Sequence, residues 1–332
     1  MIESDVKINV SKLQPEAVPQ SMHEFNNHLT KIMESNPKWW EVGAAKYRQM
    51  RVEGKTALPG RMTLEGGKNT TIPSRDSGRE IPCRIFRPEH GNVKGVFMHI
   101  HGGGWAMGSH EDFDLLLKTM ANGADLAVIS VGYRLAPEDP FPAGPHDCYD
   151  AAEWLVDNAE SEFSAPLRFI SGESAGGHLS VLSALHLLKT RPSHHLSGLV
   201  LHYGAFDLSN LPSVQNFHTE LILSTEIMQH FYDAFLPGVT GEQRKSPEVS
   251  PFYADLTGLK LPPALFTCGT ADPLLDDSIM MGIKWQAAGA EAIVKLYPGA
   301  PHAFNGFPPD KVPAAKECNE TTLQFIKEKL GS

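Results

Sequence analysis

The stretch that decides the fold is Gly172-Glu173-Ser174-Ala175-Gly176-Gly177. It follows an apolar, strand-like run at 167–171 and opens a helix-like stretch at 177–188. A strand, a sharp glycine turn, a serine and a helix in this order are typical of a nucleophile elbow, which exposes the serine hydroxyl. The flanking glycines permit the tight turn and the close approach of helix and strand. The stretch therefore predicts that Ser174 is a nucleophile at a strand-to-helix corner.

A second glycine-rich string, His101-Gly102-Gly103-Gly104-Trp105, lies upstream and follows an apolar run at 95–100. Backbone N–H groups of such a loop can bind the oxyanion that develops when a carbonyl is attacked. The candidate donors of this oxyanion hole are Gly103 and Gly104, together with Ala175 directly after the serine. The two strings together predict an acyl-transfer enzyme.

Strand-like and helix-like segments alternate along the chain from about residue 78 onward. The predicted strands lie at 81–86, 95–100, 126–131, 167–171, 199–203, 264–268 and 292–296, and the predicted helices at 113–121, 148–158, 177–189, 275–288 and 312–329. This alternation predicts an α/β fold with a mostly parallel central sheet and helices on both faces. Both glycine strings follow strands, where sheets of this kind place their sites.

Two segments fall outside the alternation. Residues 22–50 read as two helices broken near Asn36-Pro37, and residues 209–237 are helix-prone; both segments are rich in apolar and aromatic side chains. Such side chains are explained either by packing onto the sheet or by a lid that shields the reaction from water. We expect an N-terminal helical cap segment at 1–55 and a catalytic domain at 56–332, with a helical cap insertion at about 209–237.

Composition excludes several classes of protein. The chain has 332 residues with 41% hydrophobic and 20% charged side chains, which is ordinary for a globular domain with a large core. A net charge of −10 argues against nucleic acid or an anionic membrane as a partner. No apolar run is long enough for a membrane span or a signal peptide, and the four cysteines fit neither a zinc site nor a disulfide framework. We therefore expect a cytoplasmic protein without a bound metal.

The sequence also indicates a base for the serine. A serine hydroxyl is a weak nucleophile until a base takes its proton, and on this type of scaffold the chain order is serine, acid, histidine. Among the histidines after Ser174, His302 lies beyond the last predicted strand, in a turn-rich loop. It is the predicted general base.

The acid has a rival. Asp272 follows the predicted strand at 264–268, one strand before His302, whereas Asp207 follows the preceding strand. Asp276 and Asp277 begin the next predicted helix, where capping and the helix dipole explain acidic residues. The chain order favours Asp272, whose task would be to hold the imidazole in the right tautomer and to stabilise the imidazolium.

Five motifs resemble the hormone-sensitive-lipase-like branch of the α/β-hydrolases, over about residues 80–330. They are His101-Gly102-Gly103-Gly104-Trp105, Gly132-Tyr133-Arg134-Leu135-Ala136-Pro137-Glu138, Gly172-Glu173-Ser174-Ala175-Gly176-Gly177, Asp272-Pro273-Leu274 and His302-Ala303-Phe304. The resemblance implies an α/β-hydrolase core with an N-terminal cap, esterase activity on short- to medium-chain acyl esters, and no cofactor. It also implies that a homodimer can form through the last strand and helix.

The same resemblance implies the site residues: Ser174 as nucleophile, Asp272 as acid, His302 as base, and an oxyanion hole formed by the glycines and alanine named above. With the apolar cap segments, the substrate is expected to be a small hydrophobic ester. Two residues depart from the family pattern. Glu173 stands where Asp or Thr is usual and Ala303 where glycine is usual, and both departures predict an altered pocket shape.

Two other functions remain open from the sequence. Arylformamidases, which cleave amides, share a similar glycine loop and a string like that from Ser174 to His178. A small-molecule receptor built on the same fold is expected to lack a member of the triad, whereas this chain has candidates for all three. The motif at 132–138 and the predicted N-terminal cap favour the esterase.

Overall fold

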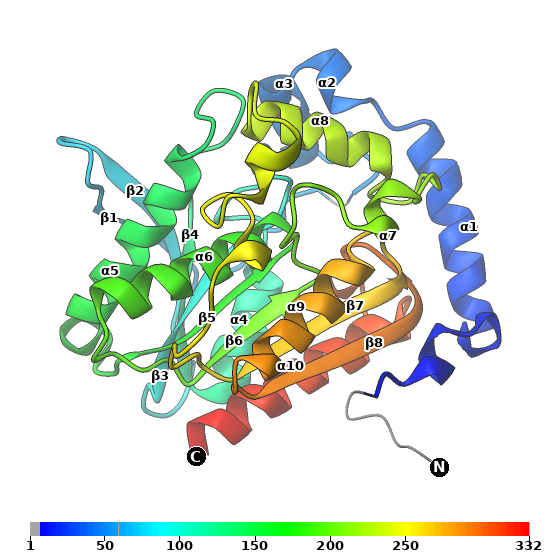
Figure 1. The fold of residues 1–332 in the computed structure, drawn as a ribbon. Coiled ribbons are helices and arrows are strands. Elements are labelled where there is room, and N and C mark those ends of the chain that lie inside the picture. The colour runs from blue at the N-terminus through cyan, green and yellow to red at the C-terminus, as the bar shows by residue number, and fades with distance from the viewer. Residues whose placement is uncertain (1–6, 59, 332) are drawn as a thin grey trace, which may run out of the picture.

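The computed structural model describes residues 7–58 and 60–331. Its centre is an eight-stranded sheet in the order β1-β2-β4-β3-β5-β6-β7-β8, in which β2 runs antiparallel to β1 and β4 and the remaining pairs are parallel (Figure 1). The strands are β1 Lys68–Pro73, β2 Glu80–Phe86, β3 Gly95–Ile100, β4 Leu126–Val131, β5 Leu167–Glu173, β6 Gly198–His202, β7 Ala264–Ala271 and β8 Ala292–Pro301. The predicted α/β class with a mostly parallel sheet is confirmed.

Helices cover both faces of the sheet, as predicted. The main helices are α1 Gln20–Glu34, α2 Trp39–Val42, α3 Ala44–Val52, α4 Asp114–Ala124, α5 Ala143–Phe163, α6 Ala175–Thr190, α7 Pro212–Gln215, α8 Thr225–Phe235, α9 Leu275–Ala287 and α10 Pro313–Gly331. Neighbouring residues of a strand point to opposite faces. Phe97 packs with α4 and α10 on one face, while Met98 belongs to the larger core formed with α5, α6 and α9 on the other.

Strand β1 was not predicted, and the physical reason lies in its exposure. It pairs with β2 at the edge of the sheet, and Ile72 is the one buried residue among its six. A strand with one buried side chain shows none of the apolar alternation that identifies a strand. The predicted pair of N-terminal helices is also more divided than expected, because Gly43, with φ of +88°, separates α2 from α3.

The N-terminal helices and the 209–237 segment lie side by side, with α2, α3 and α8 together at the top of Figure 1. The rings of Trp39 and Phe231 stack with centroids 5.1 Å apart, and those of Trp40 and His230 with centroids 3.9 Å apart. Residues from α1 and from the loop before α8 share a smaller apolar cluster. Two segments that are distant in sequence therefore form one layer.

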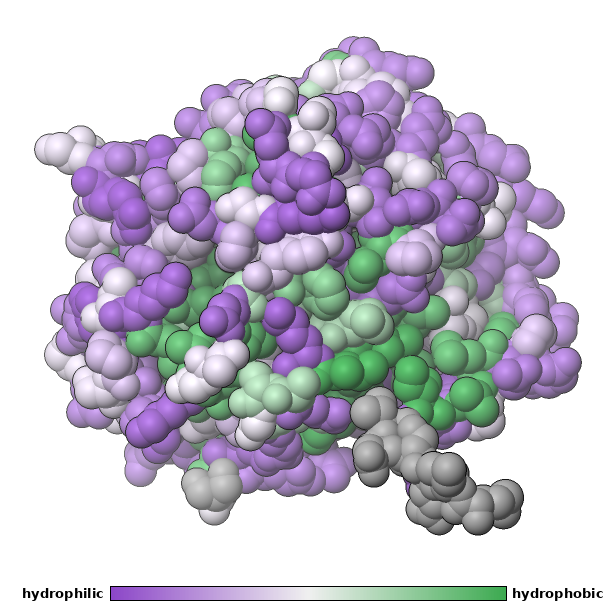
Figure 2. All heavy atoms as spheres, in the orientation of Figure 1, coloured by the Kyte–Doolittle hydropathy of each residue, from purple (hydrophilic) through white to green (hydrophobic). Residues whose placement is uncertain are grey.

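The surface is mostly hydrophilic in the orientation of Figure 1, with apolar side chains gathered over α9 and β8 (Figure 2). Among the helices that the structure describes, none combines the length and the apolar character that crossing a bilayer requires.

Three of the buried histidines near the carboxyl ends of the strands, His101, His178 and His202, have strongly shifted pKa values. His101 and His178 are inaccessible to solvent and His202 is 2% exposed. Burial lowers the pKa of each ring to about 4, because the protein interior solvates an imidazolium poorly. The folded protein therefore holds all three rings neutral at pH values where the unfolded chain begins to protonate them.

This arrangement predicts that the free energy of unfolding falls as the pH is lowered from about 6.5 towards about 4. In that window the unfolded chain binds protons that the folded protein does not, so acid favours unfolding by up to about 1.4 kcal/mol per histidine and pH unit. Urea unfolding at several pH values measures the slope. The variant His178→Gln should flatten it, while the exposed His195→Gln should not. Equal slopes in the two variants would contradict the prediction.

Candidate active site

Ser174 occupies the corner between β5, which ends at Glu173, and α6, which begins at Ala175. Its backbone has φ of +55° and ψ of −117°, a conformation that side-chain-bearing residues rarely adopt. The turn is closed by glycines that admit no side chain. A Cβ on Gly176 would lie 1.9 Å from the carbonyl oxygen of Ile100, and one on Gly172 would lie 2.3 Å from the carbonyl carbon of Gly176.

The structure brings the three predicted triad residues together. His302 Nε2 lies 3.0 Å from Ser174 Oγ, and His302 Nδ1 lies 2.9 Å from Asp272 Oδ2. The other carboxylate oxygen, Asp272 Oδ1, accepts the backbone N–H of Leu274 at 2.8 Å. A carboxylate on Nδ1 assigns the ring proton to that nitrogen, which leaves Nε2 free to accept the hydroxyl proton. Asp272 and His302 are 2% and 5% exposed, so this chain of hydrogen bonds is shielded from water.

The loop that carries His302 is held by contacts that the sequence did not reveal. The Tyr203 ring meets the imidazole edge to face, with centroids 4.7 Å apart, and its hydroxyl donates to Asn305 Oδ1. Ala303 has a left-handed backbone with φ of +60°, which explains why glycine is common after the histidine in the family that the sequence resembles. Tyr203 directly follows β6. Its position at the end of a strand is the one feature of the sequence that could have indicated a place near the site.

The candidate oxyanion donors lie on the loop after β3 and at the start of α6. Gly103 and Gly104 have φ of +120° and +59°, and a Cβ on Gly103 would lie 2.3 Å from the Met107 carbonyl oxygen. In the described part of the chain, we find no internal acceptor for the N–H groups of Gly103, Gly104 or Ala175. These three backbone donors, on the loop after β3 and at the residue after Ser174, therefore remain available.

His178 connects this loop to its surroundings. Trp105 Nε1 donates to His178 Nδ1 at 3.1 Å, and His178 Nε2 donates to the Val249 carbonyl oxygen at 2.8 Å. One bond needs the ring as acceptor and the other needs it as donor, which matches the neutral form of the imidazole. The Trp105 ring also stacks on Phe235, with centroids 4.7 Å apart. His178 thus packs and hydrogen-bonds in the interior.

The rival acids have other partners. Asp207 accepts hydrogen bonds from Ser209 and from the Tyr253 hydroxyl at 2.9 Å, and none of its contacts is with His302. Asp277 accepts the backbone N–H groups of Phe206 and Asp207 at 2.6 and 2.8 Å, and burial raises its pKa well above the ordinary value. Asp277 therefore anchors the loop after β6, a role beyond the helix-dipole explanation that its position indicated.

Two further acids of the motif region hold elements in place. Asp147 on α5 is inaccessible to solvent and accepts from the guanidinium groups of both Arg79 and Arg134. Glu138 accepts from Arg48 of α3, which connects the N-terminal helices to the loop after β4.

Glu173, which departs from the family pattern, lies in the interior. Its side chain is 4% exposed and contacts His99 of the neighbouring strand β3. The cysteines are also buried, and burial raises the pKa of Cys83 and Cys318 to about 12, so these thiols stay protonated. Within the described residues, no group of three or more His, Cys, Asp or Glu side chains is placed to hold a metal ion.

Comparisons with known proteins agree with this fold. Residues 97–306 match a family model described as the alpha/beta hydrolase fold. The carboxylesterase NlhH of Mycobacterium tuberculosis is 32% identical over 297 residues, which cover 87% of this chain and 89% of that protein. The ethyl acetate hydrolase of Pseudomonas putida is 30% identical, over 70% of this chain and 74% of its own length.

Solved structures extend the similarity. A hormone-sensitive lipase from a metagenome library is 26% identical, with a TM-score of 0.76 over 94% of this chain and 99% of that one. Fold, motifs and relatives therefore agree: the chain belongs to the α/β-hydrolase family, among the carboxylic ester hydrolases that resemble hormone-sensitive lipase.

Proposed function

We propose that the chain is a serine carboxylesterase that hydrolyses short- to medium-chain acyl esters through Ser174, His302 and Asp272. The observation that carries this proposal is the continuous chain of hydrogen bonds from Asp272 through His302 to the hydroxyl of Ser174. The hydroxyl sits on a strained turn, and the N–H groups of Gly103, Gly104 and Ala175 have no internal acceptor in the described part of the chain. We therefore infer that one ester group bound at Ser174 contacts the nucleophile and these donors together.

In the first step Ser174 Oγ attacks the ester carbonyl carbon while His302 Nε2 takes the hydroxyl proton. The carbonyl oxygen becomes an oxyanion and accepts from the N–H groups of Gly103, Gly104 and Ala175. Each such donor contributes about 3 kcal/mol to lowering the barrier. Asp272 stabilises the imidazolium without taking its proton.

The intermediate then collapses. The bond from the carbonyl carbon to the alkoxy oxygen breaks, the imidazolium gives its proton to the leaving alcohol, and the acyl group stays on Ser174. In the second half, His302 takes a proton from water as the water attacks the acyl-enzyme. The carboxylic acid leaves and the hydroxyl of Ser174 recovers its proton.

We also propose that the helices within residues 1–55 and 209–237 form a cap over this site. A Cβ on Gly104 would lie 2.3 Å from the ring of Phe231, so α8 packs directly on the oxyanion loop. The Trp39 ring stacks on the Phe231 ring and so connects the N-terminal segment to α8. Aromatic rings this close to the loop favour a small hydrophobic ester. The Pseudomonas relative is named for an ester of that size.

Replacement of the nucleophile tests the proposal. The variant Ser174→Ala should lose turnover of an activated aryl ester and labelling by an organophosphate, because no hydroxyl remains to be acylated.

Replacement of the acid gives a separate test. Asp272→Asn should lower kcat by about 10⁴-fold, because it favours the wrong tautomer of His302. The rival acid supplies the control: Asp207→Asn should keep most of the activity, since its contacts are with Ser209 and Tyr253.

Three outcomes would count against the esterase. Substantial hydrolysis by Ser174→Ala would remove the nucleophile assignment. A higher kcat/KM on an aryl formamide than on a short aryl ester would favour an amide hydrolase. A wild-type protein that binds ester analogues but takes no organophosphate label would favour a receptor.

The cap generates a second prediction. Shortening Phe231 to alanine removes the ring over Gly104, so the preferred acyl chain should become longer by a few carbons, with less activity on acetate. An acyl-chain series of aryl esters measures this preference. The control is Gln229→Ala, an exposed residue of the same helix, which should leave the profile unchanged. A profile of Phe231→Ala that matches the wild type would contradict the cap.

A further inference from the structure

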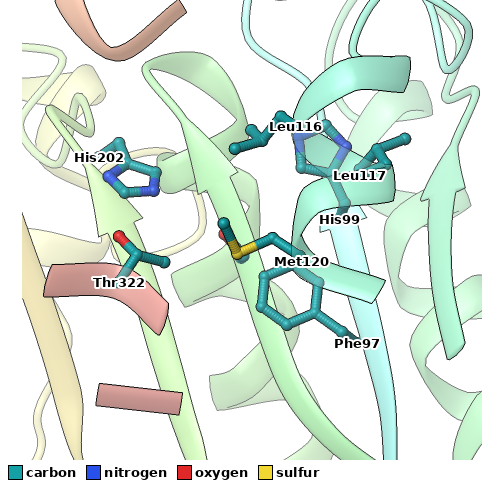
Figure 3. Close-up of a pocket in the computed structure, with 8 residues that line it drawn as sticks. Phe97, His99, Leu116, Leu117, Met120, His202 and Thr322 are labelled. Atoms are coloured by element: carbon teal, nitrogen blue, oxygen red, sulfur yellow. The ribbon is translucent and has the colours of Figure 1, made fainter. Parts of the chain in front are cut away.

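A row of buried polar side chains crosses the sheet directly beneath the nucleophile. Five adjacent strands, in the order β4, β3, β5, β6 and β7, each contribute one member. These are Ser130, His99, Glu173, His202 and Thr267, and none is more than 3% exposed. His99 and His202 face a narrow cavity between the sheet and helices α4 and α10, where Leu116, Met120 and Thr322 also lie (Figure 3). Polar groups this deep need partners within the fold.

The members of the row supply those partners to one another. His99 Nδ1 lies 2.9 Å from Ser130 Oγ, while His99 Nε2 lies 3.0 and 3.1 Å from the two carboxylate oxygens of Glu173. His202 Nδ1 lies 2.7 Å from Thr267 Oγ1. Burial by itself raises the pKa of Glu173, but the nearby His99 and His202 rings lower it by more. The pKa of Glu173 therefore lies below its ordinary value. Glu173 is thus a buried carboxylate that accepts the Nε2–H of His99.

The His99–Glu173 contact lies where the two halves of the candidate active site begin. Two residues after His99 the chain enters the oxyanion loop, and one residue after Glu173 comes Ser174. The two backbones also touch just beyond the ends of the two strands, since a Cβ on Gly102 would lie 2.7 Å from the Glu173 carbonyl oxygen. The contact therefore joins the strand end that leads to the donors with the strand end that leads to the nucleophile.

We propose that Glu173 is a positioning residue for the reaction. Its contact with His99 holds the end of β5 against the end of β3, and this sets the distance between Ser174 Oγ and the N–H groups of Gly103 and Gly104. A carbonyl group must reach the nucleophile and the donors at once, so a small shift between the two strand ends lowers the rate. The inference rests on the proposed esterase function.

The test compares Glu173→Gln, His99→Gln and the double variant on an activated aryl ester. Active sites are counted by organophosphate titration, so that misfolded molecules do not enter kcat. Each single variant should lower kcat about tenfold with KM within about twofold of the wild type, because geometry in the transition state changes more than substrate binding. The double variant should be no slower than the slower single variant, since both substitutions weaken the same contact: Glu173→Gln removes the charge of the acceptor, and His99→Gln removes the ring that fixes the position of the donor.

A matched control separates positioning from stability. Elsewhere in the core, Arg84 and Asp114 form a buried ion pair between β2 and α4, with side chains 5% and 0% exposed. Asp114→Asn should lower Tm but leave kcat per active site unchanged. If Glu173→Gln behaves in the same way, or if the two single effects multiply in the double variant, the inference is overturned.

A second variant covers the case in which Glu173→Gln does not fold. Glu173→Asp keeps the charge but withdraws the carboxylate from His99 by one methylene, so kcat per active site should fall by a smaller factor, about threefold. A value equal to the wild type would also overturn the inference. Failure of the proposed function is distinguishable, because the wild-type protein itself would then take no organophosphate label.

Discussion

The arrangement depends on one close approach of backbone to backbone, between the start of α6 and the end of β3. Gly176 lies against the Ile100 carbonyl oxygen with no room for a side chain, and Gly172 lies against Gly176. This approach forces Ser174 into its strained conformation and brings the N–H of Ala175 next to the oxyanion loop. A larger residue at position 176 would separate the nucleophile from that loop, so the constraint acts on geometry and on the proposed chemistry together.

The parallel sheet explains how residues from distant parts of the sequence meet near this contact. The loops after β3, β5, β7 and β8 leave the same edge of the sheet, and they carry the candidate oxyanion glycines, Ser174, Asp272 and His302 in turn. Adjacent strands thus deliver groups that are far apart in sequence. Helix α8 reaches the same edge through Phe231, whose ring lies against Gly104.

Beneath the edge, polar groups take positions that apolar side chains could fill. His99, Glu173 and His202 form part of the buried row, while Asp277 binds the backbone of the loop after β6. Burying ionisable groups is unfavourable unless they are paired, and replacing a buried pair by apolar residues is often neutral or stabilising. Their concentration below the nucleophile, in contrast to the apolar core nearer the amino ends of the strands, fits a role in placing the loops above.

The sequence by itself determined the alternation of strands and helices, the serine corner and the order of acid and histidine, because these depend on local patterns and short motifs. Only the tertiary structure showed that Asp272, and not Asp207, contacts His302, since both acids follow strands and the contact joins loops that are distant in sequence. It also decided the edge strand β1, the support of His302 by Tyr203 and the pairing of Glu173 with His99. Each of these results from contacts between segments that sequence separation conceals, since a side chain's partners depend on register and packing.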